Sequence, residues 1–157
     1  MSAFTPAGGP MPDIAMETSD GGTVRPSDFR GRKLAVFFYP KDDTPGCTSE
    51  AKDFSALMGA FEQAGCAVLG VSKDPPTKHR KFIDKHGLTV QLATDAEEGG
   101  LSDALSIWAE KSMYGRTYMG MVRSTYLLDV EGNIAQAWHK VKVKGHAEEV
   151  LAAAQAL

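Results

Sequence analysis

The sequence has few cysteines and no long apolar segment. Only two cysteines, Cys47 and Cys66, occur among 157 residues. Two are too few for a disulfide framework, and this number fits a reducing compartment such as the cytoplasm. No apolar run approaches the roughly 20 residues that span a bilayer, and no basic region followed by an apolar stretch marks a secretory signal. We therefore expect a cytoplasmic protein without a membrane partner.

Patterns for several ligands are also missing. The net charge of −3 gives no indication of a nucleic-acid partner. Neither cysteine has metal-ligand spacing and the four histidines are scattered, so no metal site is expected. The chain has no Cys-x-x-Cys motif, because Thr44 stands where the first cysteine would precede Cys47. Dithiol exchange of the usual thioredoxin type is therefore excluded.

The composition is that of one globular domain. Hydrophobic residues make up 43% of the chain and charged residues 24%, which is ordinary for this class. A chain of 157 residues is long enough for one domain with a substantial core. We expect a single domain over residues 1–157, in which the Gly- and Pro-rich residues 1–12 form an extended, loosely held N-terminal segment.

Hydrophobic periodicity and turn residues predict alternating strands and helices. The predicted strands cover residues 14–17, 23–24, 33–39, 66–72, 90–93, 122–128 and 134–138. The predicted helices are a turn over 26–29, a long helix over 44–65, a helix from 74 to 87, a short helix over 101–108 and a final helix over 146–157. This order predicts an α/β, thioredoxin-like fold with a central mixed sheet and extra N-terminal strands.

The most informative stretch covers residues 36–50. An apolar run ends at Pro40, a polar turn follows, and Cys47 comes where a helix should begin. Thr44 suits the N-cap of that helix and Pro45 suits its first position, so Cys47 falls in the first turn. Free backbone N–H groups and the helix dipole favour the nucleophilic thiolate there. A lone cysteine is otherwise more often a small buried hydrophobic residue.

Pro40, Thr44 and Cys47 fit the Pro-x-x-x-Thr-x-x-Cys signature of the peroxiredoxins. The surrounding residues 38–48 resemble the branch called peroxiredoxin Q, or bacterioferritin comigratory protein. Residues 114–125 are similar to the stretch that carries the active-site arginine of that branch. The resemblance covers nearly the whole chain. It implies a thiol peroxidase that acts on hydrogen peroxide and small organic hydroperoxides without metal, haem or flavin.

The resemblance also implies roles for individual side chains. Cys47 attacks the peroxide and becomes a sulfenic acid, and Arg123 stabilises the thiolate and the departing oxygen. The Thr44 hydroxyl orients the peroxide, although it could also cap the helix. Pro40 shields the sulfur from water, unless it only ends the strand. Glu50 either holds Arg123 in place or is simply an acidic residue favoured by the helix dipole.

Other residues near these motifs are expected to be structural. Tyr39, Trp108, Met113, Met119 and Met121 could line a pocket, but core packing is the preferred interpretation. The alternating lysines of residues 140–144 are interpreted as a strand with one solvated face rather than as a site for an anionic partner.

The position of a resolving cysteine departs from the commonest pattern of the branch. Many members carry it five residues after the attacking cysteine, where this chain has Lys52, or in the following helix, where residues 75–86 contain none. The expected helix between Cys47 and Cys66 spans about 24 Å, whereas a disulfide needs Cα atoms within about 7 Å. We therefore predict a one-cysteine mechanism with an external thiol reductant: thioredoxin, glutaredoxin or glutathione.

Two other functions stay open at this point. Cys47 could act as a peroxide-sensing switch that relays oxidation to a partner, or it could be inert in a thioredoxin-like interaction module. Multiple turnovers with a thiol donor would distinguish a peroxidase from both. Because no exposed apolar strand is evident and the branch is often monomeric, a monomer is expected.

Overall fold

The fold is given by a computed structural model that describes residues 7–157. The strands are β1 (Met16–Thr18), β2 (Thr23–Val24), β3 (Lys33–Phe38), β4 (Cys66–Ser72), β5 (Gln91–Thr94), β6 (Trp108–Met113), β7 (Arg116–Met121), β8 (Ser124–Leu128) and β9 (Ile134–His139). The helices are the 3₁₀ turn η1 (Pro26–Phe29) and α1 (Pro45–Ala56), α2 (Met58–Gln63), α3 (Pro76–His86), α4 (Leu101–Ala104) and α5 (His146–Ala156).

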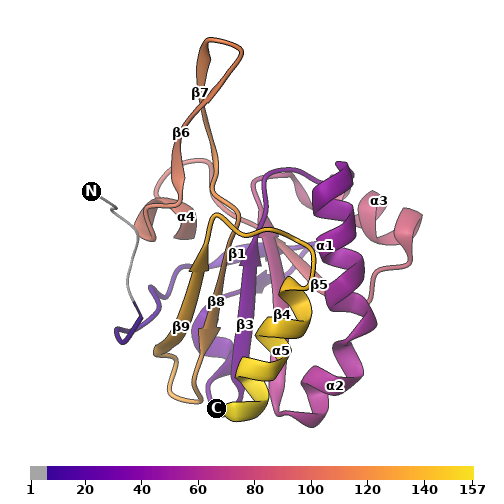
Figure 1. The fold of residues 1–157 in the computed structure, drawn as a ribbon, viewed down its shortest axis with the longest axis vertical. Coiled ribbons are helices and arrows are strands. Elements are labelled where there is room, and N and C mark those ends of the chain that lie inside the picture. Colours follow the sequence, from indigo (N-terminus) through magenta and orange to yellow (C-terminus); the bar gives the residue numbers. More distant parts are fainter. Residues whose placement is uncertain (1–6) are drawn as a thin grey trace.

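Seven strands form one mixed sheet in the order β2-β1-β5-β4-β3-β8-β9, and β6 and β7 form a separate ribbon (Figure 1). Strands β3, β4 and β5 run parallel, while β8, β9, β1 and β2 pair antiparallel. The sequence prediction of an α/β, thioredoxin-like fold with a central mixed sheet and extra N-terminal strands is confirmed. None of the helices in the described part is long and apolar enough to cross a membrane.

Strand β3 lies in the middle of the sheet and separates two apolar clusters. Its side chains alternate between the faces, so Val36 and Phe38 enter one cluster and Phe37 enters the other. Helices α1, α2, α3 and α5 contribute buried side chains to the Phe37 cluster, among them Phe54, Phe61, Phe82 and Val150. The helix that carries Cys47 is thus packed directly on the central strand.

The predicted long helix over residues 44–65 is wrong. Helix α1 ends at Ala56 and α2 begins at Met58, because Leu57 has backbone angles of φ −101° and ψ 5° and its N–H bonds to Phe54 and Ser55. Because the hydrophobic repeat continues on both sides of this break, the sequence pattern predicts a single helix.

The predicted helix over residues 101–108 is also wrong in its second half. Helix α4 stops at Ala104, Ser106 adopts a positive φ of 61°, and Trp108 begins β6. The short helix is fixed by the buried Asp95, whose carboxylate accepts hydrogen bonds from the backbone N–H groups of Leu101 and Ser102. A side chain outside the helix therefore decides its start.

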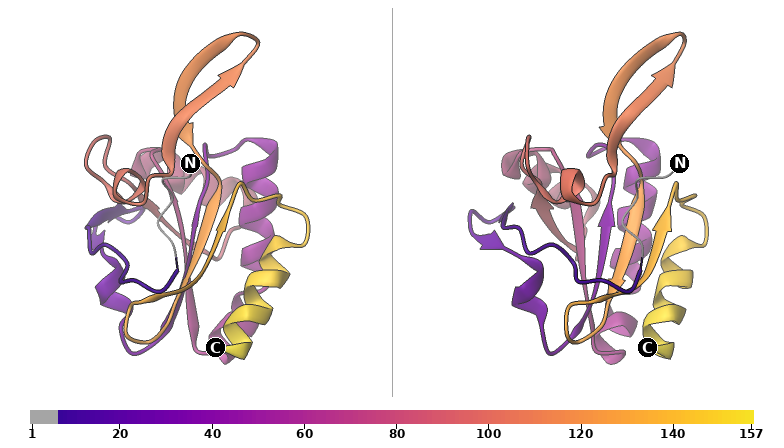
Figure 2. Two further views of the ribbon diagram at one scale, coloured as in Figure 1. Left: turned by 60° about the vertical axis from the view of Figure 1, so that its left-hand side comes forward. Right: turned by 90° about the vertical axis from the view of Figure 1, so that its left-hand side faces the viewer.

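The β6–β7 ribbon was not predicted. It stands away from the sheet in all views (Figures 1 and 2) and turns at Tyr114 and Gly115, both with positive φ, as a two-residue hairpin requires. Met113 and Met119 are 55% and 53% exposed, so the prediction that they pack in the core is wrong. Three other predicted core residues are placed as follows: Tyr39 and Met121 are buried, and Trp108 is partly buried.

Three smaller expectations are corrected. Strand β8 begins at Ser124 rather than at residue 122. Residues 140–144 form no strand, since Lys140 turns the chain after β9 with a φ of 52°. Residues 1–6 lie outside the described part, but residues 7–12 are not loosely held: hydrogen bonds join Gly8 and Gly9 to Ile134 at 2.7 and 2.8 Å.

Candidate active site

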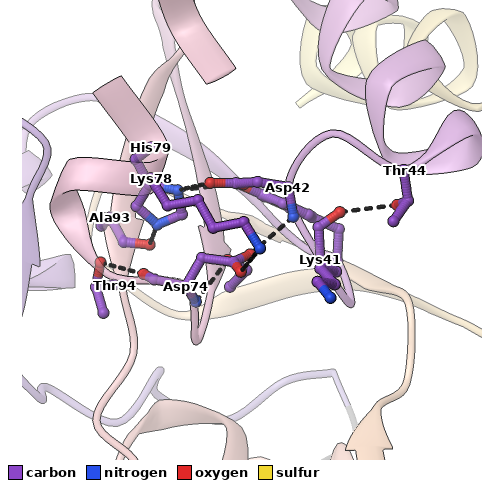
Figure 3. Close-up of polar contacts among 10 residues, drawn as sticks. Lys41, Asp42, Thr44, Asp74, Lys78, His79, Ala93 and Thr94 are labelled. Atoms are coloured by element: carbon purple, nitrogen blue, oxygen red, sulfur yellow. Dashed lines mark hydrogen bonds and ion pairs between the residues drawn. The ribbon is translucent and has the colours of Figure 1, made fainter. Parts of the chain in front are cut away.

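Cys47 lies in the first turn of α1, as the sequence predicts. Pro45 occupies the first helical position and Thr44 the N-cap, with extended backbone angles. The Thr44 hydroxyl does not cap the helix, however: it donates to the carbonyl of Lys41 at 2.8 Å (Figure 3). The Cys47 side chain is only 1% exposed, so a peroxide must reach a sulfur that is almost covered.

Arg123 reaches the sulfur from the segment between β7 and β8. Its Nη2 donates to Cys47 Sγ at 3.4 Å, and its Nη1 donates to Glu50 Oε1 at 2.6 Å. A Cβ on Gly46 would lie 3.2 Å from Nη2, so the glycine before the cysteine leaves room for the guanidinium. The structure therefore brings Arg123 together with Glu50 and Cys47, which precede it by 73 and 76 residues in the sequence.

The charges of this group are coupled. Burial alone would lower the pKa of Arg123, but Glu50 and Cys47 raise it above its usual value, so the guanidinium stays cationic. Burial raises the pKa of Glu50 to about 7 despite the attraction of Arg123. Glu50 is 1% exposed and its Oε2 has no hydrogen-bond partner among the described residues. The glutamate therefore titrates near neutral pH beside the guanidinium that contacts Cys47.

We expect this titration to appear in the pH dependence of stability. Because the folded-state pKa of Glu50 is raised from 4.5 to about 7, the folded protein binds more protons, and stability falls as pH rises through that window. Relative to Glu50→Gln, the wild type should lose about 3 kcal/mol of unfolding free energy between these pH values. Urea unfolding of both proteins across the window measures the difference, and parallel profiles would contradict the assignment.

Lys111 is a further cation near the sulfur that the sequence did not indicate. It extends from β6 across β7, where its Cδ would lie 3.0 Å from a Cβ on Gly120. Burial and the charge of Arg123 lower its pKa, while Cys47 raises it. Only pairing of the unpredicted ribbon could have placed this lysine, since nothing in its local sequence points to Cys47.

Pro40 and Cys66 lie away from these contacts. Pro40 is exposed at the end of β3. Cys66 pairs with Lys33 at the start of β3, one strand length of about 17 Å from the end that leads to Cys47. Both cysteines are free, and burial raises the pKa of the Cys66 thiol to about 11. This arrangement agrees with the prediction that Cys47 and Cys66 lie too far apart for a disulfide.

No group of three or more His, Cys, Asp or Glu side chains that could hold a metal ion occurs within residues 7–157. The arrangement that the structure does show is a cysteine in the first turn of a helix, with the guanidinium of Arg123 at 3.4 Å from its sulfur. On a thioredoxin-like fold, this arrangement defines a class of thiol-based redox proteins.

Comparisons with known proteins identify the family. The profile of the AhpC/TSA family matches residues 7–137. Peroxiredoxin Bcp of Bacillus subtilis is 44% identical over 140 residues, which cover 89% of this chain and 88% of that protein.

Solved structures agree. Peroxiredoxin Q of Xanthomonas campestris has a TM-score of 0.86 and 45% identity, covering 91% of this chain and 90% of that one. The Xanthomonas campestris bacterioferritin comigratory protein, described for its alkyl peroxide reduction activity, has a TM-score of 0.85 and 44% identity with the same coverage. This chain belongs to the AhpC/TSA family, in its peroxiredoxin Q or Bcp branch. It is a thiol-dependent peroxidase, as the sequence motifs predicted.

Proposed function

We propose that this peroxidase works with one cysteine, Cys47, and is reduced by an external thiol. The observation that carries the proposal is the 3.4 Å contact between Arg123 Nη2 and Cys47 Sγ, in a chain whose second cysteine is the first residue of β4, beside the opposite end of β3. Thioredoxin, glutaredoxin and glutathione are the candidate reductants, and hydrogen peroxide and small organic hydroperoxides are the substrates.

The first step forms an S–O bond and breaks the O–O bond of the peroxide. The Cys47 thiolate supplies the electron pair, the terminal oxygen stays on sulfur as a sulfenic acid, and the other oxygen leaves as hydroxide or alkoxide, which takes a proton from water. Arg123 stabilises both the thiolate and the departing negative charge. One external thiol then forms a mixed disulfide with Cys47 and releases water, and a second thiol restores the free cysteine.

Thr44 and Pro40 complete the proposed site. The Thr44 hydroxyl uses its hydrogen on the Lys41 carbonyl, so its lone pairs are left to accept a hydrogen bond from the peroxide O–H. The N–H of Cys47 lies in the first helical turn, where no intrahelical acceptor is available, and can donate to the peroxide. Pro40, which lies in the same segment between β3 and α1 as Thr44, is proposed to shield the sulfur from water, although its own side chain is exposed.

The experiment that tests the mechanism is oxidation of the reduced protein by hydrogen peroxide in a stopped-flow instrument. We expect rapid oxidation of both wild type and Cys66→Ser, no reaction for Cys47→Ser, and a sulfenic acid or external-thiol adduct on Cys47 by mass spectrometry. A Cys47–Cys66 disulfide that Cys66→Ser abolishes would contradict the one-cysteine mechanism. Repeated turnover with an added thiol would separate the peroxidase from a peroxide sensor.

The assembly and compartment are part of the same proposal. We expect a monomer. Of the two edge strands of the sheet, β2 has only two residues, which disfavours pairing with another sheet, whereas β9 has six. The exposed Met113 and Met119 on the ribbon overturn the expectation that no apolar strand surface is exposed, so light scattering on the reduced sample is the direct check. Two free thiols support a reducing cytoplasm.

A further inference from the structure

The loop between β3 and α1 is fastened by a buried polar network (Figure 3). Asp42, in the middle of this loop, is 2% exposed, and His79 of α3 is fully buried. His79 Nδ1 lies 2.6 Å from Asp42 Oδ2, and the Tyr39 hydroxyl donates to Asp42 Oδ1 at 2.6 Å. The carboxylate therefore has a specific partner on each of its two oxygens.

The contact of the second ring nitrogen of His79 shows which atom donates there. His79 Nε2 lies 3.1 Å from the carbonyl oxygen of Ala93. A carbonyl only accepts, so Nε2 donates there, and a second hydrogen is shared between Nδ1 and Oδ2 of Asp42, which lie 2.6 Å apart. The imidazole, which belongs to α3, thus links the loop between β3 and α1 to strand β5. In a buried site, removal of one partner leaves the other polar group buried without a hydrogen bond, which costs free energy.

The backbone of Asp42 is held independently. Its N–H donates to Asp74 Oδ2 at 2.7 Å, and the Ser72 hydroxyl donates to the same oxygen at 2.7 Å. Burial opposes ionisation of Asp74, but these hydrogen bonds and the ammonium of Lys78 at 3.2 Å lower its pKa, so it stays a carboxylate. Both the side chain and the main chain of Asp42 are therefore tied to the end of β4 and to α3.

We propose that Asp42 and His79 are positioning residues for the peroxidase reaction. The hydrogen bond to Cys47 Sγ comes from Arg123 rather than from either residue. Asp42 is two residues before Thr44 and five before Cys47, so its pairing with His79 determines the positions of the Thr44 hydroxyl and of the start of α1. Displacement by about 1 Å of a group that orients a reactant can slow a reaction up to 100-fold. The inference rests on the proposed roles of Thr44 and Cys47.

The neighbouring Asp43 provides a matched control. It also pairs with α3, through Lys85 at 2.8 Å and His86 at 2.8 Å, but its side chain is 40% exposed. Exposed ion pairs of this kind contribute little, and its positive φ of 61° is a conformation that asparagine accepts. Asp43→Asn therefore removes charge from the same loop without disturbing the buried network.

The test compares two amides at position 79. Asparagine places an amide nitrogen close to the position of Nδ1 and can still donate to Asp42, whereas glutamine places its amide near Nε2 and reaches only Ala93. We expect His79→Gln to slow single-turnover oxidation of Cys47 by hydrogen peroxide about tenfold or more. His79→Asn should stay within about threefold of wild type, and Asp43→Asn within about twofold. Urea unfolding of each variant records its stability.

The outcomes separate positioning from a purely structural role. The proposal would be overturned if the oxidation rate fell equally in His79→Asn and His79→Gln, or if the rates simply followed the loss of stability. An unchanged rate in folded His79→Gln would overturn it as well. If His79→Gln does not fold, Tyr39→Phe removes only the hydroxyl that orients Asp42 and should slow oxidation about threefold; an unchanged rate there is equally decisive. Slow oxidation of the wild type would instead reject the proposed function.

Discussion

Replacing Arg123 by methionine is expected to slow oxidation of Cys47 by hydrogen peroxide about 100- to 1000-fold. The guanidinium is the charged group that contacts the sulfur, at 3.4 Å, and fixed donors aimed at developing negative charge contribute factors of this size. The fold should survive, because the buried Glu50 left without its cation already has a pKa raised to about 7 and can bind a proton.

The comparison needs a control arginine and a conservative variant. Arg116 is exposed on β7, and Arg116→Met should leave the rate within about twofold, since isolated surface charges have small effects. Arg123→Lys keeps the charge but loses the two-nitrogen geometry that serves Cys47 and Glu50 together, so it should recover only part of the rate. Single-turnover stopped-flow oxidation measures all three, and a fast Arg123→Met would remove Arg123 from the mechanism.

Replacing Phe54 by alanine is expected to lower the free energy of unfolding by about 3–5 kcal/mol, the range for a deleted core aromatic ring. Phe54 is fully buried on α1. Its ring stacks on Phe37 of β3 with centroids 4.4 Å apart and lies 5.9 Å from the ring of Phe61 on α2. The side chain therefore holds together the central strand and both halves of the broken helix.

Urea unfolding of the reduced protein measures this loss. Leu57→Ala is the matched comparison, because Leu57 lies at the junction of α1 and α2 but is only partly buried, and it should cost clearly less than Phe54→Ala. A loss below about 1 kcal/mol for Phe54→Ala would mean that the ring does not fill the core as described. Since α1 also carries Cys47, faster local opening of this helix should accompany the loss of stability.

The two predictions concern a side chain that contacts the sulfur and a core side chain of the helix that carries it. Arg123 contacts the sulfur directly, whereas Phe54 packs the helix whose first turn carries that sulfur against the central strand. Asp42 and His79 form a third group, whose hydrogen bonds hold the loop that joins β3 to α1. A reactive cysteine in this protein is thus a local feature of the sequence that depends on contacts made by distant segments.

The sequence by itself determined the local features of the site. An apolar run, a proline and a Thr-Pro-Gly turn are sufficient to place Cys47 in the first turn of a helix after a buried strand, because caps, proline geometry and hydrophobic periodicity act over a few residues. The same local signals gave the order of the seven strands of the main sheet, and hence the thioredoxin-like class, but not the β6–β7 ribbon. The family resemblance added Arg123, which no local pattern would have selected.

Only the tertiary structure decided which distant side chains meet. The burial of Asp42 against His79 joins segments 37 residues apart. The break at Leu57 and the projecting β6–β7 ribbon with Lys111 are set by backbone conformations that the hydrophobic pattern did not reveal. Glu50 had two equally acceptable interpretations until Arg123 was found 2.6 Å from it. Such pairings are decided by the burial and hydrogen bonding available in the folded chain, and the sequence specifies them only through the whole fold.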